Sequence, residues 1–356
     1  MSDPHSLIAT SRFHQRVTLD SICGELTVSF ADIGSPTGPA LLFLPGMFAS
    51  RYLGVPLHPL AEHAGVRLLV VDRPGMGAST DVPPAQRIAA WTDLVPRLLA
   101  HLGIPRVSLV AHSAGTMYLL NTWAKCPELV NPAITFIAPW VDLEHSRVTT
   151  MQMARYVPTK AFTLWHHIPR FFVTQASPVL ATSGALFNQL SSRSSDVTDG
   201  NDHSHPNAED QAIERDAGIS QKDLAELFRL AVPLMFNENT TGANSEALQC
   251  LRKSDGQDWG ACSDYAECVQ TLAARESSAG TRVSVRAYFA SSDAMVGERG
   301  KLYFEQCWQA PGLDAVDFVS ETVEKTDHDT VMQLVKVWAE IFASAGRFPA
   351  TYHIDY

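Results

Sequence analysis

The chain contains 356 residues, with 38 acidic and 27 basic side chains and a formal net charge of −11 at pH 7. Hydrophobic residues make up 46% and charged residues 18%, which is typical of a globular protein and unlike a disordered one. The acidic balance argues against nucleic acid and an anionic membrane surface as partners, because both attract basic surfaces. The length suits two domains or one large α/β unit with an insertion.

The N-terminus and the cysteines indicate a compartment. Residues 1–10 lack the basic and apolar regions of a secretory signal, and no stretch approaches the roughly 18 uninterrupted apolar residues that span a bilayer. The six cysteines form no C-x-x-C pair, so we expect free thiols, and no histidines stand near them at zinc-finger spacing. We therefore predict a cytoplasmic protein without a membrane segment or a metal centre; its oligomeric state stays open.

The first 140 residues alternate between short apolar runs and helical patterns. Three of these runs, residues 67–72, 106–111 and 133–138, are almost wholly apolar, which is typical of strands buried on both faces of a parallel sheet. Strands are predicted at residues 25–33, 40–44, 67–72, 106–111 and 133–138, and helices at residues 85–102 and 113–125. This alternation predicts a doubly wound, mostly parallel α/β sheet.

The alternation stops near Asp142 and resumes near Thr281. Later strands are predicted at residues 283–289 and 315–320, with helices at 298–308 and 329–345, and the middle shows helical patterns at 149–156, 160–175, 209–236 and 263–276. Residues 191–210 are nearly devoid of apolar side chains, so we expect a mobile loop there. We predict one core of residues 1–142 and 281–356, interrupted by a helical cap at residues 143–280.

The segment 111–115, Ala-His-Ser-Ala-Gly, joins a predicted strand to a predicted helix. Such a small-x-Ser-x-Gly turn holds its serine in strained backbone geometry above the sheet, with the hydroxyl exposed at the helix N-terminus. Ser113 could instead be only the N-cap of its helix, which is a common role of serine. The flanking strand and helix favour a nucleophile.

With this turn in place, the sequence resembles the α/β-hydrolase fold family over residues 1–142 and 281–350. Residues 41–48 (LLFLPGMF) look like the oxyanion-hole loop of that family, and residues 72–79 (DRPGMGAS) are similar to its D-x-x-G-x-G-x-S loop. Two positions depart from the family pattern, since Ala111 replaces a glycine and Pro45 replaces a histidine. A looser resemblance links the chain to hydrolases of fungal secondary-metabolite pathways.

A serine nucleophile needs a base and a carboxylate, and the chain order of the family is serine, acid, histidine. Only His328 follows a late strand by a short loop and opens the last predicted helix. Asp293 follows the strand at 283–289 by four residues, where the family places its acid. Asp142 is the rival acid, because some family members use that position instead.

The remaining site predictions concern the oxyanion and the pocket. The backbone N–H groups of Ala114 and Met47 are the expected oxyanion donors. We expect the side chain of His112 to point away from that of Ser113, and Asp72 to stabilise its loop. Phe48, Trp140 and Trp165 are the candidate pocket residues.

These residues predict an enzyme in which Ser113 attacks a carbonyl, His328 acts as the base and Asp293 steadies the imidazolium. The expected substrate is an ester, thioester or lactone of a hydrophobic small molecule, and no metal or organic cofactor is required. Other chemistry of the same residues stays open: C–C bond hydrolysis, acyl transfer, cyclase or lyase action, or aminopeptidase activity. So does a ligand-binding role on a hydrolase scaffold.

Overall fold

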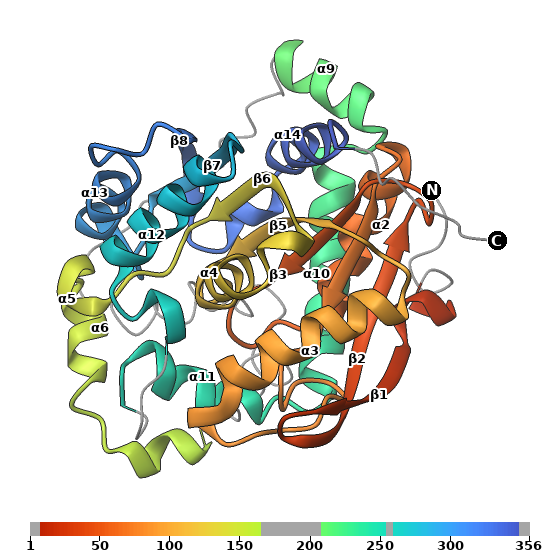
Figure 1. Ribbon diagram of the computed structural model, residues 1–356. Coiled ribbons are helices and arrows are strands. Elements are labelled where there is room, and N and C mark those ends of the chain that lie inside the picture. The colour runs from red at the N-terminus through yellow and green to blue at the C-terminus, as the bar shows by residue number, and fades with distance from the viewer. Residues whose placement is uncertain (1–7, 165–207, 254–258, 349–356) are drawn as a thin grey trace, which may run out of the picture.

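One eight-stranded sheet runs through the computed structural model, which describes residues 8–164, 208–253 and 259–348 (Figure 1). The strand order is β1-β2-β4-β3-β5-β6-β7-β8. The pairs β1–β2 and β2–β4 are antiparallel, and the five other pairs are parallel. The strands are β1 Gln15–Ser21, β2 Gly24–Gly34, β3 Ala40–Leu44, β4 Arg67–Val71, β5 Val107–His112, β6 Val130–Ile137, β7 Val283–Ser292 and β8 Val316–Asp327. The predicted fold class is confirmed.

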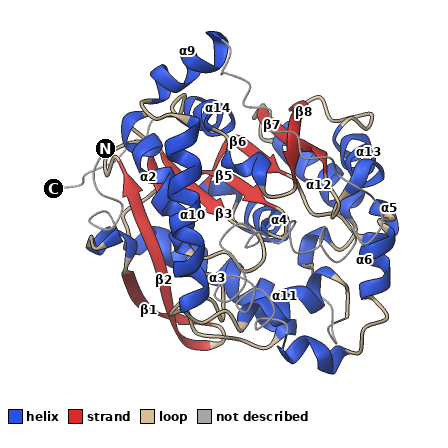
Figure 2. Ribbon diagram, turned by 180° about the vertical axis from the view of Figure 1, so that it is seen from behind, coloured by secondary structure: helices blue, strands red, loops and turns tan. Residues whose placement is uncertain are grey.

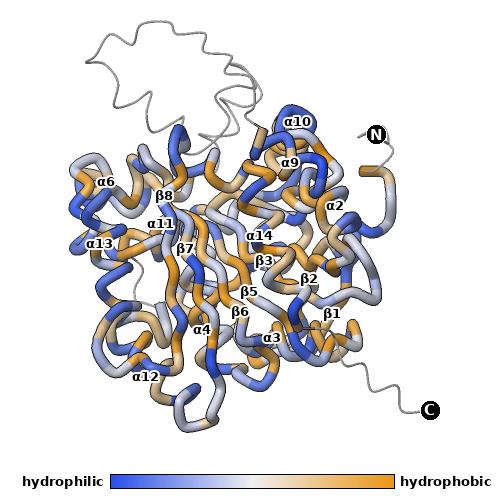
Figure 3. The backbone as a smooth tube through the Cα atoms, turned by 90° about the horizontal axis from the view of Figure 1, so that it is seen from above, coloured by the Kyte–Doolittle hydropathy of each residue, from blue (hydrophilic) through white to orange (hydrophobic). Residues whose placement is uncertain are grey.

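Helices cover both faces of the sheet (Figure 2). On one face α3, α4, α12 and α13 share an apolar core with the strands, and on the other α2, α10 and α14 share a second core. Figure 3 shows the hydrophobic central strands between these two helical layers. The helices are α2 Gly54–His63, α3 Arg87–His101, α4 Gly115–Lys125, α5 Leu143–Ser146, α6 Thr149–Ala154, α9 Ala208–Ala217, α10 Gln221–Asn237, α11 Gly242–Cys250, α12 Tyr265–Ser278, α13 Gly297–Trp308 and α14 Val335–Ala345.

The central strands follow the apolar runs closely because both of their faces are covered. Every residue of β3 and β5 is buried. The edge strand β1 was not predicted, and its burial alternates between half-buried and exposed positions. A strand that is covered on one face only and carries polar residues shows a weaker sequence signal.

The chain between β6 and β7 holds helices and no strand within its described residues. The single pattern predicted at 209–236 is two helices, because Gly218 adopts a positive φ of 71° after α9 and Ser220 caps α10. The pattern at 160–175 gives a 3-10 helix at Thr159–Leu164, and its remainder lies outside the described residues.

Part of this segment belongs to the two layers that cover the sheet. Helix α10 packs on α2, and α12 packs on α4 and α13. The predicted loop at 191–210 lies outside the described residues up to 207, and α9 already begins at Ala208. The cap boundaries at 143 and 280 therefore stay a prediction.

Two further findings concern the described residues. All six cysteines are free thiols. Within the described ranges, no helix combines the length and the apolar character needed to cross a membrane.

Candidate active site

Ser113 occupies a tight turn between β5, which ends at His112, and α4, which begins at Gly115. Its φ is 49°, a left-handed conformation that is uncommon outside glycine, and its N–H donates to the carbonyl of Ile137 at 3.1 Å. The glycine at 115 is required for close packing, since a Cβ there would lie 1.9 Å from the carbonyl oxygen of Leu44. The local sequence thus presents the serine at the carboxyl end of the parallel strands.

Three side chains from three separate strand ends meet at this turn. The Nε2 atom of His328 lies 2.7 Å from Ser113 Oγ, and its Nδ1 atom lies 2.8 Å from Asp293 Oδ2. Asp293 follows β7 directly, and His328 follows β8. The structure therefore brings together the three residues that the sequence proposed as nucleophile, base and acid.

Asp293 is held in place on both of its oxygens. While Oδ2 faces His328, Oδ1 accepts the N–H groups of Met295 and Val296, each at 2.8 Å. Burial opposes ionisation of this carboxyl, but the charge and hydrogen bond of His328 and the two N–H donors outweigh it, so the pKa of Asp293 is lowered. Asp293 is therefore an ionised, oriented acceptor.

The pKa of His328 moves in the opposite direction. Burial favours the neutral ring, yet the attraction of Asp293, its hydrogen bond and the nearby Asp329 and Asp327 prevail and raise the pKa above its ordinary 6.5. With Nδ1 facing Asp293, Nε2 can accept the proton of Ser113 Oγ. The pair therefore has the geometry and the charge of a base supported by an acid.

His112 is buried beside this pair, and its ring bonds the backbone of His328, whereas the ring of His328 contacts Ser113 Oγ. The Nε2–H of His112 donates to the backbone carbonyl of His328 at 2.9 Å, and the two rings lie 5.2 Å apart. Burial first, and then the charge of His328, lower the pKa of His112 to about 4. His112 is thus a neutral ring that supports the backbone of His328.

The loop after β3 lies against the nucleophile. A Cβ on Gly46 would lie 2.8 Å from His112 Nδ1 and 3.2 Å from Ser113 Cβ, so only glycine allows this approach. Within the described part of the chain, no backbone hydrogen bond engages the N–H of Met47 or of Ala114. Both expected oxyanion donors therefore belong to segments that border Ser113.

The rival acid and the candidate pocket residues have distinct positions. The carboxylate of Asp142 caps α5 and forms ion pairs with Arg155 and Arg252, so its oxygens are engaged by these groups and not by His328. Phe48 is buried with a φ of 67°, and its ring lies 6.1 Å from that of Phe236.

Trp140 borders the turn through its backbone, whose N–H lies 3.3 Å from the carbonyl oxygen of Ser113. Its side chain is buried, and the indole N–H has no hydrogen-bond partner among the residues that the structure describes. The third candidate, Trp165, lies outside the described residues.

Sequence reasoning missed a buried charge cluster behind the Gly46 loop. Arg73 and Glu246 form an ion pair with side chains 1% and 0% exposed, and Arg87 joins the same carboxylate. The motif at 72–79 contained Arg73, but nothing in it pointed to a partner 173 residues away. Among the described residues, no group of three or more His, Cys, Asp or Glu side chains could hold a metal ion.

Comparison with known proteins agrees with the architecture of the sheet. The family model described as alpha/beta hydrolase fold matches residues 39–225. No curated protein shows significant sequence similarity to the chain.

Several solved structures share the fold at low sequence identity. A carboxylesterase from the thaumarchaeon Nitrososphaera gargenis is 15% identical with a TM-score of 0.56, over 93% of this chain and 99% of its own. An esterase from Thermogutta terrifontis is 15% identical with a TM-score of 0.54, over 95% and 100%. A bromoperoxidase from Bacillus anthracis is 14% identical with a TM-score of 0.55, over 94% and 100%. At such identities the likeness establishes the fold only, and the reaction has to be inferred from the residues of the site.

Proposed function

The chain belongs to the α/β-hydrolase fold family, and we propose that it is a serine hydrolase that cleaves an ester, thioester or lactone through a covalent acyl-enzyme. The observation that carries this proposal is the continuous contact from Ser113 Oγ through the ring of His328 to Asp293, with distances of 2.7 and 2.8 Å. Such a chain makes a serine hydroxyl nucleophilic near neutral pH. The substrate is a small molecule.

In the proposed reaction, Ser113 Oγ attacks the carbonyl carbon while its proton passes to His328 Nε2. The oxyanion accepts hydrogen bonds from the N–H groups of Ala114 and Met47, and Asp293 stabilises the imidazolium. His328 then protonates the leaving oxygen or sulfur as the carbonyl forms again. Water, deprotonated by His328, attacks the acyl-enzyme and releases the acid and Ser113.

The buried aromatic residues at the site favour an apolar acyl group. Phe48 directly follows the proposed donor Met47, and Trp140 is bonded through its backbone to the nucleophile turn. We assign both to the pocket wall and extend the pocket to Trp165. Residues 143–280 form the proposed cap, which selects the substrate on a common catalytic core.

A fluorophosphonate probe and a series of p-nitrophenyl esters test this function. Wild type should react covalently at Ser113 and hydrolyse esters, whereas Ser113→Ala should do neither. Asp293→Asn should lower kcat by about 10⁴-fold, because the imidazolium and its orientation lose their support.

Asp142→Asn is the matched control, since it removes the rival carboxylate and should leave kcat close to wild type. Failure of the probe to modify wild-type protein would eliminate the acyl-enzyme proposal and favour a binding role. A greater loss in Asp142→Asn than in Asp293→Asn would reverse the assignment of the acid.

A further inference from the structure

Arg73 grips the backbone of the loop that carries the proposed oxyanion donor Met47. Its Nη1 donates to the carbonyl of Pro45, and its Nη2 donates to the carbonyl of Gly46 at 2.8 Å. The guanidinium is fully buried, so these bonds are shielded from water. Two successive carbonyls of one loop are therefore fixed by a single planar cation.

The Gly46 carbonyl accepts from Arg73 and, more weakly, from the N–H of Ala49 at 3.2 Å, and its orientation determines where the next N–H group points. The carbonyl of Gly46 and the N–H of Met47 belong to one peptide unit, and in a trans peptide the two point in opposite directions. With the carbonyl turned toward Arg73, the Met47 N–H points away from it. The nucleophile turn lies against Gly46, since a Cβ there would approach Ser113 Cβ to 3.2 Å.

The same bond also strengthens the donor. A hydrogen bond from a charged group polarises the carbonyl that accepts it, and the polarisation extends to the N–H of the same peptide unit. A cation on Gly46 thus makes the Met47 N–H a better partner for developing negative charge. Phe48, which follows Met47, itself has a φ of 67°, a conformation that is unusual outside glycine.

A buried arginine of this kind needs a buried counter-charge, and the chain between β6 and β7 supplies it. The carboxylate of Glu246 in α11 accepts a hydrogen bond from Arg73 Nη2 at 2.9 Å and a second one from Arg73 Nε. Four of the five donors of Arg73 are thereby occupied, two by loop carbonyls and two by Glu246.

We propose that Arg73, neutralised by Glu246, is the positioning residue of the oxyanion hole: it orients and polarises the Gly46–Met47 peptide toward Ser113. This inference rests on the proposed serine hydrolase function. It also gives the inserted segment a direct effect on the reaction, because α11 holds the residue that keeps Arg73 in place.

The test compares Arg73→Lys with Arg87→Lys, two identical substitutions at the same carboxylate. Lysine keeps the charge but cannot hold both loop carbonyls as a planar fork. We expect Arg73→Lys to lower kcat by about 10- to 100-fold with little change in KM, since losing one oxyanion donor outright costs about 10²–10³. Arg87 bonds Tyr118, Asp81 and Glu246, and Arg87→Lys should retain the wild-type kcat.

A pair of inhibitors separates positioning from general packing. An alkyl trifluoromethyl ketone forms an oxyanion adduct with the serine, whereas the matching methyl ketone binds without that charge. In Arg73→Lys the affinity for the trifluoromethyl ketone should fall by the same factor as kcat/KM, and that for the methyl ketone should not change. The double variant Arg73→Met/Glu246→Gln removes both charges of the pair, and it should show the same kcat loss if the lysine variant fails to fold.

A wild-type kcat in Arg73→Lys would overturn the proposal, and so would equal losses in Arg73→Lys and Arg87→Lys with parallel loss of both inhibitors. These results differ from failure of the proposed function itself, in which wild-type protein would not react with the fluorophosphonate probe at all.

Discussion

Burial lowers the pKa of His328 and the nearby carboxylates raise it, and the carboxylates have the larger effect, so the pKa is raised. A general base must be neutral, so protonation of His328, the proposed base, should remove activity at low pH. We expect kcat/KM for an ester to rise with pH and to reach half of its maximum above pH 6.5, the ordinary value for histidine. A pH–rate profile measures this midpoint directly.

Asp329→Asn provides the matching variant, because Asp329 raises the pKa of His328 while the bond to Asp293 stays in place. Removing its charge should move the midpoint to lower pH with the maximum rate retained. A wild-type midpoint near 4 would point instead to His112, whose pKa is lowered to about that value.

At the residue scale, the sequence was most informative where a residue stands in a recognisable local pattern. Ser113 stands in a strand–turn–helix pattern, and Asp293 and His328 follow strands in a fixed chain order, so all three could be proposed before the structure. Arg73 and Glu246 could not, because charged residues are expected at the surface and their pairing depends on tertiary packing. Distant partners leave no local pattern.

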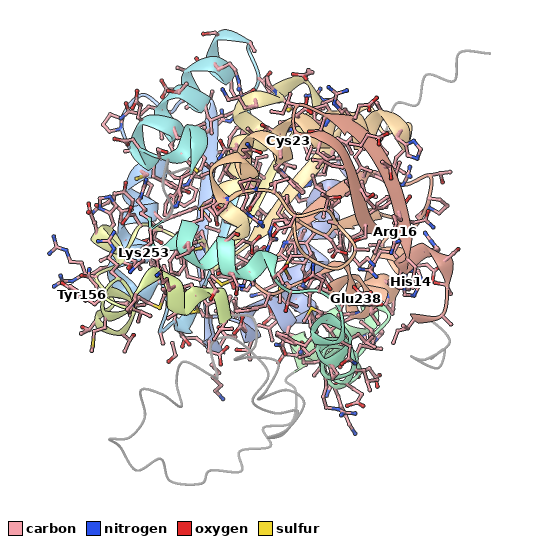
Figure 4. The ribbon with its side chains drawn as sticks, turned by 90° about the horizontal axis from the view of Figure 1, so that it is seen from below. His14, Arg16, Cys23, Tyr156, Glu238 and Lys253 are labelled. Atoms are coloured by element: carbon pink, nitrogen blue, oxygen red, sulfur yellow. The ribbon has the colours of Figure 1, made fainter. Side chains whose placement is uncertain are left out.

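At the element scale, the loop at 72–79 interlocks with the start of α11. Gly77 N–H donates to the carbonyl of Asn239, and Gly242 N–H donates to that of Gly75. Arg51 adds ion pairs to Asp72 and to Glu238, which follows the end of α10 and is labelled in Figure 4. Backbone bonds and buried charges thus join two segments far apart in the sequence.

This interlock predicts a strict requirement for glycine at position 242. A Cβ there would lie 2.3 Å from the carbonyl oxygen of Pro74, so Gly242→Ala must push α11 away from the loop. We expect the free energy of unfolding to fall by about 1–3 kcal/mol, the range for overpacked sites, as measured by urea denaturation.

Gly346→Ala is the control, because a Cβ there has its nearest neighbour at 3.4 Å. It should change stability by no more than about 0.5 kcal/mol. A loss of stability in Gly242→Ala as small as that expected for Gly346→Ala would show that α11 can shift away from the loop without a cost in free energy.

The strands were predictable in proportion to how fully they are buried. Strand β3 coincides with its apolar run, whereas β1 is an edge strand with alternating exposure and was missed. Helix α2 was also missed, since its glycine and two prolines weaken a helical pattern even though most of its residues are buried. Tertiary packing stabilises this helix where local propensity does not.

At the scale of the whole molecule, we expect the free energy of local unfolding to differ from one helix to another. Helix α10 buries six side chains and lies next to the Arg51–Glu238 ion pair, while α6 buries only Met151. Tyr156, which follows α6, is 87% exposed and projects at the edge of the molecule (Figure 4). The described parts of the chain between β6 and β7 therefore differ in how firmly they are attached.

Hydrogen exchange measured by mass spectrometry can resolve this difference. We expect β3, β5 and α10 to exchange slowest, because their hydrogen bonds open only with the two cores, and α6 and β1 to exchange faster. Exchange of α10 as rapid as that of α6 would show that the whole inserted segment moves as one cap.

The contact between Ser113 Oγ and His328 Nε2 joins residues separated by 215 positions. During synthesis at about 5–20 residues per second, the proposed base His328 follows the proposed nucleophile Ser113 by roughly 10–40 s. Throughout that interval the nascent chain carries a serine hydroxyl without a base beside it, which is a weak nucleophile. The proposed reactivity of Ser113 would thus begin only when β8 and His328 have joined the fold.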